Sequence, residues 1–315
     1  MQRLQFLSRK ADRPRPWYLD VNRLGIATVE MLGTIAALFV YFFVRGGRPD
    51  DIESSLTRGL QIIDFEKRLG IFTEVHWQEV FLQYDLLMAI ANQVYAWGHY
   101  PVLAAIGTWL AIKNPSRFRF VRNVMLLSGL VGIAAYWLLP TAPPRLIHLS
   151  GIDFGFVDTV HGSADVVYMQ PAPFVNDFAA LPSFHFGWIA LASAAIWVNT
   201  SNPFLRALAV AMSVVMWWAI VVTGNHFFFD MVAGGLVVAV CWVAVAYLDR
   251  IGVSARLTEM VRAGAARLLP PLTAFVRSRV GRLRSHLANA VAYAPARARD
   301  RSRSLDTRLR RGGSA

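Results

Sequence analysis

Residues 206–248 read RALAVAMSVVMWWAIVVTGNHFFFDMVAGGLVVAVCWVAVAYL, and this stretch decides the fold. Two apolar runs, 206–222 and 227–248, flank a short polar stretch that contains Asn225 and His226. A helix that crosses a bilayer needs about 20 consecutive, mainly apolar residues. The stretch therefore predicts two membrane-spanning helices joined by a polar turn, and it excludes an ordinary soluble domain.

Four more segments repeat this pattern, so the sequence predicts an all-α integral membrane protein with six transmembrane helices. The other expected spans are 24–44, 87–112, 123–139 and 183–198. A composition of 55% hydrophobic residues and a mean hydropathy of +0.40 agree with this class. The first span is expected to be retained, because it contains Glu30 and no small-residue cleavage site follows it. The sequence from Gly98 to Pro101 leaves open a division of the second span into a surface helix and a tilted helix.

The distribution of basic residues predicts the orientation in the membrane. Short cytoplasmic segments beside membrane spans carry an excess of Lys and Arg. The segments expected on one side hold 26 of the 32 basic residues, whereas the opposite segments, 45–86 and 140–182, hold six basic and twelve acidic residues. Both termini are therefore expected in the cytoplasm, which requires an even number of spans and favours six.

The predicted boundaries follow from the spans and the charge. We expect a cytoplasmic segment at 1–23, a six-helix membrane domain at 24–248, basic amphipathic helices at 249–293 and a disordered tail at 294–315. The amphipathic segment is expected to lie on anionic lipid headgroups, and a solvated tail that only fixes the topology is the alternative. The net charge of +12 is concentrated beyond residue 248 without a recognition motif, so nucleic-acid binding is not expected.

Three polar clusters fall at helix ends on the predicted extracytoplasmic side. They are PTAPPR at 140–145, PSFH at 182–185 and TGNHFFFD at 223–230. Ionisable groups at membrane depth cost free energy unless they are paired or functional. Because all three clusters lie on one side in the topology that the charges favour, we expect a functional site there.

The residue types in these clusters suit phosphate chemistry. Ser183 is placed as an N-cap, which leaves the first backbone N–H groups of the following helix free to bind an anion. His226 and Asp230 are four residues apart and are expected on one helical face, where the carboxylate would hold one imidazole nitrogen protonated and leave the other nucleophilic. Arg145 offers a planar fork that matches phosphate oxygens. His185, from another helix, could give a proton to a leaving oxygen.

Each of these features has a simpler interpretation. An isolated histidine at a membrane interface is more often structural, and the Phe227 to Phe229 run could simply face lipid. A histidine–aspartate pair could bind a metal, but further ligands are missing and Cys241 is the only cysteine, so no metal or cofactor is expected.

The motifs resemble those of the type 2 phosphatidic acid phosphatase superfamily of lipid phosphatases and phosphotransferases. Its Pro-Ser-x-His motif matches 182–185, and the His-x-x-x-Asp end of its third motif matches His226 and Asp230. The resemblance covers roughly residues 85–248 and implies six spans with the active site on the extracytoplasmic face. It also implies that His226 is the nucleophile that becomes phosphohistidine, that Asp230 orients it and that His185 is the general acid.

The sequence departs from the usual motifs of that superfamily at two cations. Ala219 and Ile220 stand where a Ser-Arg pair begins the third motif, and Leu138 stands where the first motif has a lysine. The remaining pattern resembles the inositol phosphorylceramide synthase (aureobasidin-resistance) branch. A phosphodiester carries one negative charge and needs fewer positive partners than a phosphomonoester dianion, so the departures favour a phosphodiester lipid.

The sequence thus predicts a membrane enzyme that acts on a lipid phosphate or phospholipid as a phosphatase or phosphotransferase. Water and an alcohol remain open as the acceptor, because both reactions share every step before the second attack. The alternative is a non-enzymatic membrane scaffold that uses its basic tail to bind lipids or partners.

Overall fold

The computed structural model describes residues 21–161, 171–253, 256, 259 and 260. It divides into two units, Met1–Tyr247 and Leu248–Ala315, and the first holds nearly all of the described residues. Residues 1–20 and most of the predicted segments 249–293 and 294–315 lie outside the described part, so the proposals for the N-terminal segment and the tail remain predictions.

Regular structure in the described residues is helical, and the one β-bridge there joins Thr141 to Ala179. The α-helices are α1 (Val21–Gly46), α2 (Ile52–Leu69), α3 (Glu74–Leu82), α4 (Asp85–Gln93), α5 (His99–Lys113), α6 (Pro115–Leu138), α7 (Phe184–Asn199), α8 (Pro203–Val222) and α9 (Phe228–Arg250). Short segments are the π-helical turn Val94–Gly98 and the 3₁₀ turns Pro144–Ser150 and Ala172–Phe174. The expectation of an all-α protein is confirmed for this part of the chain.

Four helices are long and apolar enough to cross a membrane: Ala27–Gly46, Pro115–Leu138, Pro203–Val222 and Phe228–Arg250. At most 33% of each apolar window is buried inside the protein. Large apolar side chains such as Val40, Leu236 and Val243 point outward, where lipid would cover them. These helices identify a membrane protein.

The other two predicted spans differ from a simple spanning helix. The expected span 183–198 corresponds to α7, which is apolar but has only 16 residues. The expected span 87–112 is formed by α4, the π-helical turn and α5 in succession. Pro101 has no N–H and crowds the preceding turn, which gives a physical reason for the wide turn just before it. A count of six spans therefore remains a prediction.

Short capped connections join the helices at one end. Asn114 and Asn202 accept hydrogen bonds from backbone N–H groups at the starts of α6 and α8, and a proline follows each of them. Both features favour helix initiation. The connection from α7 to α8 is only a few residues long, so these two helices pack side by side in opposite directions.

Two glycines bring α7 and α9 into close contact. A Cβ added at Gly187 would lie 2.9 Å from the Gly234 carbonyl oxygen, and one added at Gly234 would collide with the Ser183 carbonyl oxygen. Small residues allow this approach of helix backbones in membrane proteins. The Ser183 N–H donates to the Asp230 carbonyl oxygen at 2.9 Å, so the packing fixes the second polar cluster against the third.

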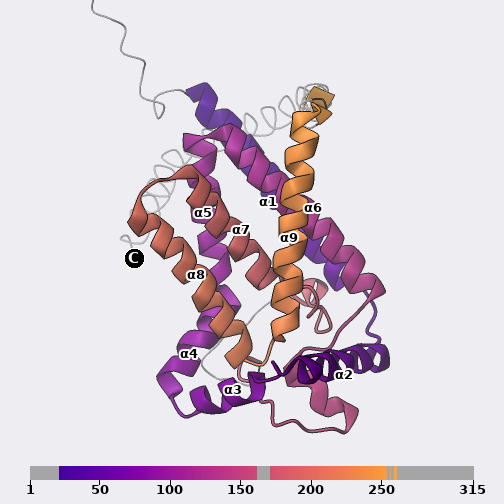
Figure 1. The fold of residues 1–315 in the computed structure, drawn as a ribbon. Coiled ribbons are helices and arrows are strands. Elements are labelled where there is room, and N and C mark those ends of the chain that lie inside the picture. Colours follow the sequence, from indigo (N-terminus) through magenta and orange to yellow (C-terminus); the bar gives the residue numbers. More distant parts are fainter. Residues whose placement is uncertain (1–20, 162–170, 254–255, 257–258, 261–315) are drawn as a thin grey trace, which may run out of the picture. The chain divides into compact units, whose positions relative to one another are not determined.

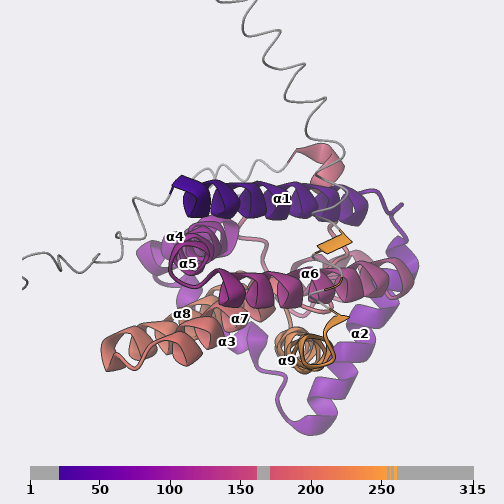
Figure 2. The same ribbon diagram turned by 90° about the horizontal axis from the view of Figure 1, so that it is seen from above.

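Helices α2 and α3 lie across the ends of α8 and α9 (Figures 1 and 2). Asp51 caps the start of α2 by accepting the Ser54 N–H, and Gly70 ends the helix with φ 70°, a value that glycine adopts readily. One face of α2 packs on the 3₁₀ turn Pro144–Ser150 through a buried apolar cluster that includes Ile63, Ile147 and Phe227. The two helices thus cover the end at which the polar clusters meet.

Candidate active site

A pocket of about 70 Å³ lies at this end of the helices. All three polar clusters contribute to its wall, through Arg145, His185 and His226. Residues from α1, the π-helical turn, α5 and the loop after the second 3₁₀ turn complete it, among them Arg45 and His99. The predicted meeting of the three clusters is therefore present in the described structure.

His226 and Asp230 are in direct contact. His226 Nδ1 lies 3.3 Å from Asp230 Oδ2, and both side chains are almost fully buried. The expectation that they share one helical face is wrong, because α9 begins at Phe228 and His226 precedes it. Asp230 reaches back over the first turn and also accepts the Phe227 N–H at 3.0 Å. This geometry holds Nδ1 beside a carboxylate and leaves Nε2 for another partner.

His185 stands in the first turn of α7 and faces the same pocket. The centres of the His185 and His226 rings are 5.6 Å apart, with an angle of 54° between their planes. The His185 ring also contacts Tyr95 at 4.5 Å and His99 at 4.7 Å between ring centres. The two histidines of the predicted site are thus neighbours, and His185 is held on its other side by aromatic rings.

Ser183 occupies the N-cap of α7, as its position before the apolar run predicts. Its side chain forms no capping hydrogen bond, and Ser183 Oγ is buried without a partner in the described structure. Ser183 does not line the pocket. The Ser183 side chain is thus not among the residues that line the pocket, and an anion site at the first backbone N–H groups of α7 stays a prediction.

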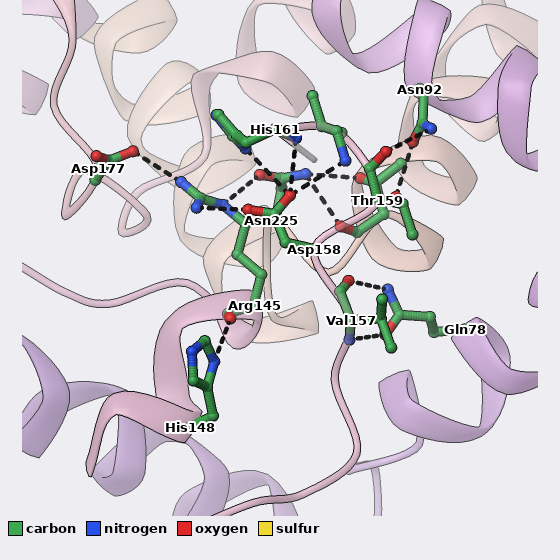
Figure 3. A network of polar contacts seen from close by, with 12 residues as sticks. Gln78, Asn92, Arg145, His148, Val157, Asp158, Thr159, His161, Asp177 and Asn225 are labelled. Atoms are coloured by element: carbon green, nitrogen blue, oxygen red, sulfur yellow. Dashed lines mark hydrogen bonds and ion pairs between the residues drawn. The ribbon is translucent and has the colours of Figure 1, made fainter. Parts of the chain in front are cut away.

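Arg145 lies at the centre of a polar network (Figure 3). Its guanidinium donates to Asn225 Oδ1 at 3.1 Å, Asp158 Oδ2 at 3.0 Å and Asp177 Oδ1 at 2.9 Å. The predicted fork is therefore present, but two carboxylates occupy it. Asp177 is 47% exposed and could be displaced by a ligand more easily than the half-buried Asp158.

The loop that carries Asp158 is anchored on both sides. Burial by itself would raise the pKa of Asp158, but hydrogen bonds from His161 and the charge of Arg145 outweigh it and hold that pKa well below its ordinary value. Gln78 bonds to both backbone groups of Val157, and Asn92 pairs with Thr159. Asp158 therefore stays ionised and fixed beside Arg145.

Two groups of residues at this site were not predicted from the sequence. Arg45 and His99 line the pocket, and Glu66 and Glu74 bind the start of α9 from behind. Arg45 follows the first span on the predicted extracytoplasmic side, where the positive-inside rule gives a basic residue no role, but no sequence motif connects it with the three polar clusters. The two glutamates lie in an amphipathic region that gives no sign of their burial. In the structure both are fully buried, which is rare for glutamate and indicates a special role.

The structure also places the residues that stand where the usual motifs have cations. Ala219 and Ile220 are fully buried in an apolar cluster at the end of α8, and Leu138 is 73% exposed at the end of α6. None of these residues lines the pocket. The arginines among its lining residues are Arg45 and Arg145.

Comparison with known proteins identifies a family for this chain. The family model described as PAP2 superfamily matches residues 60–244, which is more than half of the chain. A phosphoinositol dihydroceramide synthase of Bacteroides thetaiotaomicron is 24% identical over 151 residues, which cover 44% of this chain and 48% of that protein. The match thus spans about half the length of this relative. No solved structure matches the chain significantly.

Proposed function

Because the chain belongs to the PAP2 superfamily, we propose that it transfers a phosphoryl or substituted phosphoryl group from a membrane lipid through a phosphohistidine on His226. The observation that carries this proposal is the contact of His226 with Asp230 in a pocket shared with His185 and Arg145. Membership of the PAP2 superfamily alone supports a lipid phosphatase or phosphotransferase. The relative from Bacteroides thetaiotaomicron is a synthase, which supports phosphotransferase activity.

The chemistry proceeds in two displacements. His226 Nε2 attacks phosphorus while Asp230 accepts a hydrogen bond from Nδ1, so the positive charge that forms on the ring is stabilised. The bond from phosphorus to the leaving oxygen breaks, and His185 supplies the proton that this oxygen needs. The oxygen of water or an alcohol then attacks phosphorus, the phosphorus–nitrogen bond breaks to free His226, and His185 takes the proton of the attacking hydroxyl.

Arg145 and Arg45 bind the non-bridging phosphate oxygens. The N-terminal turn of α7, which follows Ser183, adds a favourable electrostatic field for the same anion. Since Asp158 and Asp177 already offset much of the charge of Arg145, the site suits a monoanionic phosphodiester better than a dianionic phosphomonoester. A phosphodiester substrate would leave a substituted phosphoryl group on His226, ready for an alcohol acceptor.

The active site faces the extracytoplasmic side, with both termini in the cytoplasm. The charge distribution supports this orientation. The segments 45–86 and 140–182, which include Arg58 and Asp158, hold more acidic than basic residues, as is expected outside the cytoplasm.

The test is incubation of the purified protein with lipid phosphomonoesters and phosphodiesters, with and without a polyol or lipid alcohol as acceptor. Both released phosphate and new phospholipids would be measured. We expect turnover of a phosphodiester that stops in His226→Ala. Turnover that persists in His226→Ala would refute the proposed nucleophile, and no turnover of any lipid would refute the proposed function.

A further inference from the structure

Three consecutive peptide N–H groups at the start of α9 donate to three different carboxylates. The bonds are Phe227 N to Asp230 Oδ2 (3.0 Å), Phe228 N to Glu74 Oε1 (2.9 Å) and Phe229 N to Glu66 Oε1 (2.7 Å). A helix cannot satisfy its own first N–H groups, and their partial positive charge favours anions. The start of α9 is thus tied to α2 by one acid and to α3 by another.

The surroundings of the two glutamates are apolar. Glu66 and Glu74 are fully buried, and residues close to them in the chain or next to the turn that they bind, Ile62, Ile63 and Phe227, belong to a buried apolar cluster. Within the described part of the chain, no lysine or arginine pairs with either glutamate, and the titratable groups that act on Glu66 are Glu74 from α3 and Asp230 from α9. Three adjacent carboxylates in such a place cannot all carry a charge, because uncompensated buried charges are too costly.

Two acids from neighbouring helices bind the same turn. Each accepts one peptide N–H group through Oε1, and their Oε2 atoms are buried without a hydrogen-bond partner in the described structure. A carboxylate only accepts hydrogen bonds, so one proton on the pair would supply the missing donor and would remove one of the buried charges. Burial and the neighbouring Glu74 carboxyl raise the pKa of Glu66 to about 9.

We propose that Glu66 and Glu74 are positioning residues that share one proton and hold the first turn of α9 so that Asp230 meets His226. The carboxylate of Asp230 binds His226 Nδ1 and the Phe227 N–H through the same oxygen, so the His226 contact depends on the backbone of this turn. Loss of the shared proton would set two like charges against each other and against Asp230. The turn would then move away from α2 and α3. This inference rests on the proposed role of His226.

The direction of the pH effect follows from the raised pKa of Glu66. Glu66 keeps its proton below about pH 9 and loses it as the pH rises through that value. In the unfolded chain the proton would leave near the ordinary value of 4.5, so this group stabilises the fold most at low pH and progressively less between 4.5 and about 9. Activity should therefore fall on the alkaline side, above about pH 9.

The experiment compares Glu66→Gln, Glu74→Gln and Glu66→Ala with the wild type across pH 6 to 10.5. Glutamine imitates the protonated acid, so kcat in Glu66→Gln should stop falling above pH 9, whereas wild-type kcat should fall about tenfold per pH unit there. Glu66→Ala removes the bond to the Phe229 N–H group together with the acid, and its kcat should drop by about 10²-fold with little change in KM, since a small misplacement near the chemistry has that scale. The control Glu79→Gln changes an exposed acid on α3 and should keep the wild-type pH profile.

A second readout does not depend on activity. Infrared spectra of the full-length protein at pH 7 should show a protonated carboxyl band that disappears in Glu66→Gln and titrates near pH 9 in the wild type. Absence of that band, or an alkaline limb that Glu66→Gln leaves in place, would overturn the shared proton. A wild type that turns over no lipid would instead overturn the proposed function, with the infrared result still deciding whether the pair holds a proton.

Discussion

Gly234 and Gly235 are adjacent on α9 and offer a matched test of how the two catalytic motifs are held together. A Cβ added at Gly234 would collide with the Ser183 carbonyl oxygen, which is backbone and has little freedom to move. A Cβ added at Gly235 would lie 3.5 Å from a ring carbon of Phe186, which is an ordinary contact. Gly234→Ala and Gly235→Ala thus change the same helix by the same methyl group, but only the first forces α7 and α9 apart.

The two variants should differ in their free energy of unfolding. Replacing glycine by alanine in a helix stabilises it by roughly 0.5–1 kcal/mol, and this gain is common to both variants, so it cancels in their comparison. Overpacking at a close contact costs about 1–3 kcal/mol. Gly234→Ala should therefore be less stable than Gly235→Ala by about 1–3 kcal/mol. The shift also moves His185 relative to His226, and a 1 Å misplacement near the chemistry can reduce the rate by about 10²-fold.

The assay combines thermal unfolding, followed by tryptophan fluorescence in detergent, with kcat on the best lipid substrate. Gly235→Ala should keep the wild-type kcat and unfold at the same or a higher temperature. Gly234→Ala should unfold at a lower temperature and lose most of its kcat. Equal unfolding temperatures and equal kcat in the two variants would refute the conclusion that close contact between α7 and α9 sets the geometry of the site.

Three further predictions concern chemistry and topology. His226→Ala should abolish acid-labile phosphoenzyme, whereas His185→Ala should still form it when the leaving group departs without a proton; a phosphate found on His185 after rapid quench and mass spectrometry would contradict this order. Arg145→Lys keeps the charge but loses the fork, so transition-state stabilisation measured as kcat/KM should fall by about 2–4 kcal/mol, and an unchanged kcat/KM would show that the fork does not bind the substrate. In a background without Cys241, an impermeant thiol reagent added to intact cells should label Gln83→Cys but not Ser201→Cys, and the reverse pattern would invert the topology.

The sequence predicts the ends of the helices better than their interior contacts. Long apolar runs define most of the membrane helices, and the three polar clusters at their ends meet in one pocket, whereas the side of the membrane stays a prediction. The histidine–aspartate contact was predicted from a spacing of four, yet it forms through a side chain that reaches back from the first turn of α9. The spacing therefore predicted the correct partner of His226, but it did not predict the geometry of the contact.

The buried acids could not be predicted in this way, because their role depends on contacts between distant segments. Glu66 and Glu74 occur in a region with many exposed acids, and nothing local distinguishes Glu74 from Glu79. The Phe227 to Phe229 run had a simple interpretation as lipid-facing bulk, but Phe227 is fully buried and the backbone of the run is bound by carboxylates. Only the packing of α2 and α3 on α9 reveals both facts.

The segment that matches the family model divides the site into two parts. It begins at residue 60, inside α2, so it includes both glutamates and the three polar clusters but excludes α1 and Arg45. The proposed positioning of the nucleophile is therefore built entirely within the shared segment. Arg45 lies outside that segment but is fixed by it, because its guanidinium donates to the Phe174 carbonyl oxygen and its own carbonyl accepts from Asn176. Since Arg45 adds a cation to a pocket that lacks the usual two, both the substrate preference and the proposed transfer step in this chain should depend on α1, which lies outside the matched segment.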